Sequence, residues 1–74
     1  MQLMFKTLSG SEISLNFEPD DTILTIKQAL QEKEGIELVM IKLIYGGKQL
    51  ADEHKIKDYN LEAGSRIHMI LQLR

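Results

Sequence analysis

The stretch that most constrains the fold lies near the end of the chain, at residues 66–70. Polar and apolar side chains alternate there, which is the period of a β-strand with one face on a core. Ile67 and Met69 are therefore expected to face inward, while His68 and Ile70 face water. Ile70 breaks the pattern, because it is a β-branched apolar side chain on the solvent face. We interpret Ile70 as part of a surface that a partner holds.

The chain loses this period after Ile70. Leu71-Gln72-Leu73-Arg74 is a largely apolar tail without a turn signal. We expect residues 69–74 to be, in part, a free arm that leaves the domain.

The length of 74 residues predicts a single domain over residues 1–74, and so small a domain must bury most of its apolar side chains. No stretch approaches the roughly 20 apolar residues of a membrane span, and the chain opens without a signal peptide. It has no cysteine, which excludes disulfides and thiolate chemistry. We expect a cytoplasmic and nuclear protein that acts as a monomer and has no membrane partner.

The net charge of −2 argues against a nucleic-acid partner, which would require a basic stripe. The charges are unevenly placed, however. Residues 18–37 carry six acids, Glu18, Asp20, Asp21, Glu32, Glu34 and Glu37, against Lys27 and Lys33. The predicted strands and tail carry Lys6, Lys42, Lys48, Arg66 and Arg74. These charges are either ordinary solvated positions or the mark of a weakly basic sheet face that prefers partners with an acidic rim.

Hydrophobic periodicity predicts the order ββαββ, then a short helical turn, then β. The expected strands cover residues 1–7, 11–17, 41–45, 48–50 and 66–69, with a helical turn over residues 55–60. The helix is expected between Thr22, which can cap its first N–H groups, and Gly35, which suits its C-terminal end. Residues 36–40 have no clean period and are expected to be a connection. One helix covering one face of a mixed sheet is the economical way to bury these stripes.

The expected core is the inward-facing set of each element. It consists of Met1, Leu3, Phe5, Ile13, Leu15, Phe17, Ile23, Ile26, Leu30, Leu43, Leu50, Ile56, Leu61, Ile67 and Met69. If Leu43 and Leu50 face inward, Ile44 must face outward, so it is a second exposed β-branched residue.

No motif for catalysis or for a cofactor emerges. Gly46-Gly47-Lys48-Gln49 lacks the upstream Gly and the following Ser or Thr of a phosphate-binding loop. His54 and His68 have no third ligand at metal-binding spacing. We therefore expect no enzymatic activity, no cofactor and no metal.

Motifs along the whole chain resemble those of the ubiquitin family. They are Met1-Gln2, Lys6-Thr7-Leu8, Glu18-Pro19, Asp21-Thr22-Ile23, Lys33-Glu34-Gly35-Ile36, Leu43-Ile44, Gly47-Lys48-Gln49-Leu50, Asp58-Tyr59-Asn60, and His68 with Leu71, Leu73 and Arg74. Ile44-Tyr45, Asp52-Glu53 and Gly64-Ser65 resemble the branch of the family that modifies cullins. The resemblance implies an α+β fold of the β-grasp type, with a mixed sheet of four to five strands packed on one helix.

The resemblance also implies a protein-binding patch. The family's patch falls on Leu8, Ile44, His68 and Ile70, with Lys42, Gly47 and Lys48 at its rim. Single exposed apolar residues are common and need no function, but several on one face are typical of interaction surfaces. Met4 occupies the position of a second, smaller patch in the family, and it can equally be an ordinary surface residue.

The resemblance also implies that the C-terminal tail joins the protein covalently to others. In the family it ends in two glycines, whose carboxylate is adenylated by an activating enzyme, passed to cysteines and joined to a substrate lysine. This sequence ends at Arg74, where those glycines would begin, so either they follow in the mature protein or the protein is not conjugated. Activating enzymes read position 72, where family members carry Arg or Ala, and Gln72 leaves the choice of enzyme open. Leu71, Gln72, Leu73 and Arg74 form the expected activating-enzyme segment.

Only some of the positions at which family members are linked into chains carry a lysine here. Lys6, Lys27, Lys33 and Lys48 are there, whereas Ser11, Ala29 and Ala63 replace the others. Lys48, beside the expected patch, is the possible chain acceptor.

Two functions therefore remain open. The first is a ubiquitin-like modifier, whose partners are activating, conjugating and ligase enzymes and ubiquitin-receptor domains. The second is a non-covalent ubiquitin-like domain of a larger adaptor that docks ubiquitin receptors or the proteasome.

Overall fold

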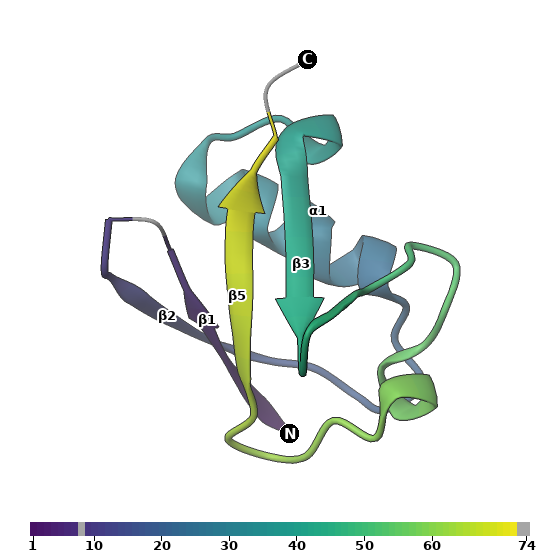
Figure 1. The fold of residues 1–74 in the computed structure, drawn as a ribbon. Coiled ribbons are helices and arrows are strands. Elements are labelled where there is room, and N and C mark those ends of the chain that lie inside the picture. The colour runs from purple at the N-terminus through teal and green to yellow at the C-terminus, as the bar shows by residue number, and fades with distance from the viewer. Residues whose placement is uncertain (8, 73–74) are drawn as a thin grey trace.

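The computed structural model describes residues 1–7 and 9–72 of the chain. Within these residues, five strands form one mixed sheet, and α1 lies against a single face of it, behind β3 and β5 in Figure 1. The elements are β1 (Gln2–Lys6), β2 (Glu12–Asn16), α1 (Ile23–Glu34), the 3₁₀ helix η1 (Leu38–Met40), β3 (Ile41–Tyr45), β4 (Lys48–Gln49), the 3₁₀ helix η2 (Ile56–Tyr59) and β5 (Arg66–Leu71). This is the predicted order, with the addition of η1 in the segment expected to be a connection.

The strands follow the spatial order β2-β1-β5-β3-β4. β1 and β2 form the expected antiparallel hairpin, in which Thr7 N–H donates to Ser11 O at 2.9 Å. β5 lies between β1, to which it is parallel, and β3, to which it is antiparallel. The last strand of the sequence is therefore the central strand of the sheet.

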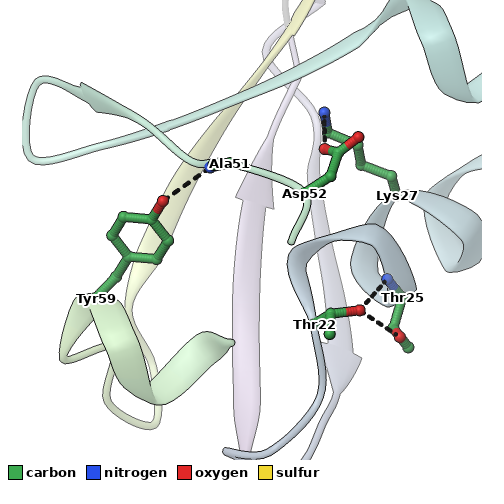
Figure 2. Close-up of polar contacts among 6 residues, drawn as sticks. All are labelled: Thr22, Thr25, Lys27, Ala51, Asp52 and Tyr59. Atoms are coloured by element: carbon green, nitrogen blue, oxygen red, sulfur yellow. Dashed lines mark hydrogen bonds and ion pairs between the residues drawn. The ribbon is translucent and has the colours of Figure 1, made fainter. Parts of the chain in front are cut away.

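The helix begins and ends where its capping residues predict. Thr22 Oγ1 accepts a hydrogen bond from Thr25 N–H at 3.3 Å, which satisfies one free donor of the first turn (Figure 2). Gly35 has φ 69°, a conformation that glycine adopts without a side-chain clash, and its N–H donates to Gln31 O at 2.8 Å.

The core lies between α1 and the sheet, and most of the expected side chains are buried in it. Its buried apolar members are Leu3, Phe5, Ile13, Phe17, Ile23, Ile26, Leu30, Ile41, Leu43, Leu50, Ile56, Leu61, Ile67 and Met69. Met1 and Leu15 are half-buried rather than buried, because Leu15 lies on the edge strand β2 and Met1 precedes β1. Ile41 was not expected in the core, yet it shares the inward parity of Leu43 on β3.

The end of the chain differs from the expected arm. β5 continues through Leu71, which pairs with Ile41, and Gln72 N–H donates to Met40 O at 2.7 Å. Residues 69–72 are therefore held by β3 and η1, because backbone pairing does not require alternating side chains. Leu73 and Arg74 lie outside the described residues.

Candidate protein-binding site

The sheet register brings the predicted patch residues together. In the antiparallel pair of β3 and β5, Ile44 lies opposite His68 and Lys42 lies opposite Ile70. Residues opposite one another in a ladder point to the same face of the sheet. That face is the one away from α1, because Leu43 and Met69, which have the other parity, are buried beneath the helix. Ile44 and Ile70 are half-buried there and His68 is exposed.

Ile44, His68 and Ile70 line a hollow on the outer face. The hollow has a volume of about 350 Å³, and its lining residues are Lys6, Thr7, Gly10, Ile44, His68, Met69 and Ile70. We call this region the outer-face hollow. Its centre combines two branched apolar side chains with an imidazole, and the β1–β2 turn forms one wall.

The predicted rim is only partly adjacent to the hollow. Lys42 pairs with Ile70 and is half-buried beside it. Lys48 instead lines a separate hollow of about 240 Å³ with Tyr45 and Tyr59. Gly47, in the β3–β4 turn with φ 80°, lines neither. Leu8 lies outside the described residues, so its predicted place in the patch is an expectation only.

The charge around the outer-face hollow is mainly positive. Lys6 lies in register with His68 on the neighbouring strand, and Lys42 follows on the far side of β5. The nearest acid in the same cross-strand row is Glu12, which forms an ion pair with Arg66 at 3.4 Å. A partner with apolar and acidic side chains would complement this face.

Met4, at the position of the family's smaller patch, lies half-buried on the same face. It sits in register with Ser14 on β2 and Arg66 on β5. The lining of the outer-face hollow does not include Met4.

One lysine at a family acceptor position is not accessible. The Lys27 side chain is only 10% exposed, and its Nζ lies 2.5 Å from Asp52 Oδ1, an ion pair drawn in Figure 2. Helical spacing could have revealed this, because Lys27 follows Ile23 by four residues and precedes Leu30 by three, on the buried stripe of α1. Burial and pairing hold its ammonium away from a reacting carbonyl.

The described residues contain no group of three or more metal-ligating side chains. In the same residues, the helices are too short or too polar to cross a bilayer.

The architecture defines the class of protein. A five-stranded mixed sheet packed on one helix over the described residues is the ubiquitin-like β-grasp fold. The sequence model of the ubiquitin family matches residues 3–74, so the chain belongs to the ubiquitin family.

Relatives of nearly the same length share almost half of its residues. Over 74 residues, the chain is 46% identical to ubiquitin-like protein 1 of Schizosaccharomyces pombe and covers 95% of that protein. It is 47% identical to the NEDD8-like protein RUB3 of Arabidopsis thaliana, of which it covers 95%. It is 43% identical to the ubiquitin-like protein NEDD8 of Dictyostelium discoideum, of which it covers 96%. In each alignment the whole of this chain is matched.

Proposed function

We propose that this ubiquitin-like protein is a modifier that is joined to lysines of target proteins through its C-terminal tail. Its similarity to NEDD8-like proteins over almost their full length supports this function. A more distant relative, 35% identical, is matched over only 49% of its length, as expected for a domain within a larger protein. The non-covalent adaptor is therefore our second candidate.

In the conjugation reaction, the reacting groups belong to the tail carboxylate, to ATP, to the enzymes and to the substrate, and not to the folded domain. An activating enzyme would join the tail carboxylate to the α-phosphate of ATP with loss of pyrophosphate. A cysteine thiolate would then displace AMP, and a substrate amine would displace the thiol to give an isopeptide bond. The domain's contribution is to hold the root of the tail at a defined place, which the bond from Gln72 N–H to Met40 O achieves.

We further propose that partners recognise the outer-face hollow. Ile44 and Ile70 would provide apolar contact area, while Lys6 and Lys42 would select acidic neighbours. The in-register pairing of Ile44 with His68 and of Lys42 with Ile70 carries this proposal, since it places all four on one face. An amphipathic receptor helix with acidic flanks has the complementary chemistry.

Conjugation can be tested with a version of the chain that carries two glycines after Arg74. We expect this protein to form an ATP-dependent thioester with an activating enzyme for ubiquitin or for NEDD8. A matched version with two alanines should not react, because bulkier residues obstruct a narrow tail channel. Comparison of Gln72→Arg and Gln72→Ala in both enzymes will show which of them the native Gln72 favours. Failure of the glycine version with both enzymes would support the adaptor function instead.

Recognition can be tested independently of conjugation. Ile44→Ala should weaken binding of ubiquitin-receptor helices by about tenfold, as expected for a central contact residue. Leu24→Ala is the matched control, because Leu24 is an exposed apolar residue, 38% accessible, on α1 in the other layer. Equal affinities of these two variants would contradict the assignment of the outer-face hollow.

A further inference from the structure

A second hollow lies in the helix layer, between α1 and η1. Its volume is about 500 Å³, larger than the 350 Å³ of the outer-face hollow. Its lining residues are Thr25, Gln28, Ala29, Gln31, Glu32 and Leu38. We call it the helix-layer hollow. It shares no residue with the patch on the sheet, so the proposed function does not account for it.

The hollow exists because of a small side chain on the helix. Ala29, half-buried against the core, is the shortest of its lining side chains. A long side chain at this position would extend across the space that Ala29 leaves open.

The far wall of the hollow is held in place by hydrogen bonds. Leu38 N–H donates to Gln31 Oε1 at 3.2 Å, which ties η1 to α1. Met40 N–H donates to Glu37 O at 3.0 Å, and Met40 O accepts from Gln72 N–H. Because η1 is fixed to both the helix and β5, a ligand would meet a preformed surface and would lose little free energy in ordering it.

The residue that follows Leu38 in the chain is an exposed apolar one. Val39 follows Leu38 in η1 and is 61% accessible, the largest exposed fraction among the big apolar side chains of the described residues. Val39 contributes almost nothing to the core. Ala29 and Leu38, which line the hollow, and Val39, the next residue of η1, each offer apolar area to solvent.

The surroundings are acidic. Glu32 lines the hollow, and two further acids are exposed, Glu34 at the end of α1 and Glu37 in the segment that connects α1 to η1. Lys27 does not offset them, because its side chain is buried against Asp52. This leaves Lys33 as the exposed cation of α1. Such a surface repels nucleic acid and anionic lipid, and it attracts lysine and arginine side chains.

We propose that the helix-layer hollow binds a short basic segment of a partner protein. An apolar side chain of that segment contacts Ala29, Leu38 and Val39, and flanking Lys or Arg side chains meet Glu32 and Glu37. The outer-face hollow prefers acidic partners, so the two layers of the molecule select partners of opposite charge. Since the layers face away from each other, both partners can bind at once.

The test begins with selection of peptides from a random phage-displayed library on the Ile44→Ala variant, which suppresses recognition at the outer face. We expect the selected peptides to carry an apolar residue flanked by Lys or Arg. Their affinities are then measured by fluorescence anisotropy for the wild-type chain and for Ala29→Lys, which fills the hollow. We expect a loss of about tenfold or more, because both the contact and the charge become unfavourable.

Ala63→Lys is the matched control. It makes the same substitution, with the same change of charge, at an exposed position in the connection before β5. Its affinity should stay close to that of the wild-type chain, while Val39→Asp should weaken binding as Ala29→Lys does. Circular dichroism should show an intact fold for Ala29→Lys, because lysine is a good helix former at a half-exposed position. Selection of acidic peptides or of none, or equal affinities for the Ala29→Lys and Ala63→Lys variants, would overturn the proposal.

Discussion

Two neighbouring residues of β3 have different roles because alternate side chains of a strand point to opposite faces of the sheet. Leu43 is fully buried beneath α1, whereas Ile44 is half-buried on the opposite face and lines the outer-face hollow. Their side chains are similar in size and chemistry, so they differ mainly in what they contact. Leu43 fills the core between the two layers, and Ile44 is available to a partner.

Truncation of these two side chains should therefore have unequal effects. Leu43→Ala should lower the free energy of unfolding by about 2–5 kcal/mol, because it leaves a cavity in the core. Ile44→Ala should cost about 1 kcal/mol or less, because water already reaches that side chain. Denaturant unfolding of both variants measures the difference. If Ile44→Ala unfolded as early as Leu43→Ala, Ile44 would belong to the core and not to a binding face.

At the scale of elements, α1 shows how local chemistry sets the limits of a helix. The Thr22 cap and the positive φ of Gly35 satisfy one backbone group at each end by contacts within the segment, whereas Ile23 N–H and Leu24 N–H donate to the distant His54 O and Asp52 O. The segment before the helix is joined to η2 by an ion pair between Asp20 and Lys57 at 2.9 Å. The caps are local interactions, whereas the ion pair joins elements that are distant in sequence.

Loss of the cap should weaken the helix measurably. Thr22→Ala removes the oxygen that accepts from Thr25 N–H, and we expect a destabilisation of about 1 kcal/mol. Thr22→Ser keeps an oxygen at this position and should retain most of the stability. Thermal unfolding followed by circular dichroism compares the three proteins. Equal losses in both variants would show that the threonine methyl group, rather than the cap, is responsible.

The ion pair between Asp20 and Lys57 should contribute a small pH-dependent stabilisation. The hydrogen bond from Lys57, and then its charge, lower the pKa of Asp20 below the ordinary value of 3.8. Because the folded-state pKa is the lower one, the stabilisation is present above pH 3.8 and is lost as the pH falls through the folded-state value. Asp20→Asn should thus be slightly less stable than the wild type at neutral pH and equally stable in strong acid.

Melting temperatures of the wild type and of Asp20→Asn, measured from neutral pH into strong acid, test this dependence. The difference should be small, because both side chains are exposed to solvent and the interaction is screened. A difference that persisted in strong acid would mean that the carboxylate charge is not its cause.

At the scale of the whole molecule, the long connection between β4 and β5 closes the fold. Residues 50–65 contain η2, and their backbone bonds reach the start of α1, as in Ile23 N–H to His54 O at 2.9 Å and Ile56 N–H to Asp21 O at 2.9 Å. Within the connection, Tyr59 Oη accepts a hydrogen bond from Ala51 N–H at 2.8 Å (Figure 2). This bond holds η2 against the chain that leaves β4.

Removal of the Tyr59 hydroxyl should loosen this connection. Tyr59→Phe leaves the half-buried Ala51 N–H without an acceptor, and we expect a cost of about 1–3 kcal/mol. Tyr45→Phe is the matched control, because within the described residues the Tyr45 hydroxyl has no hydrogen bond. Denaturant unfolding and amide exchange at Ala51 measure the effect. Equal stabilities of these two variants would show that the hydroxyl bond contributes little.

Much of this structure was predictable from the sequence, because strand alternation, helical spacing and caps depend on residues close together in the chain. Alternation assigned Leu43 and Ile67 to the inner face and Ile44 and His68 to the outer one, and this is where they lie. Helical spacing and the caps predicted both ends of α1. Alternation also predicted that Ile44, His68 and Ile70 share the outer side of the sheet. Their grouping into one patch came from the family resemblance, because alternation within each strand does not say which strands are neighbours.

The order of residues dictates which face of each strand and helix is apolar, since side-chain direction follows from the backbone repeat. Tertiary structure alone decided the neighbours across the sheet. It placed β5 at the centre, so that His68 lies between Lys6 and Ile44, and it held Leu71 and Gln72 against β3 and η1. It also paired Lys27 with Asp52 and left a hollow beside Ala29. The reason is that hydrogen bonds and ion pairs between segments distant in the chain leave no periodic mark in either segment.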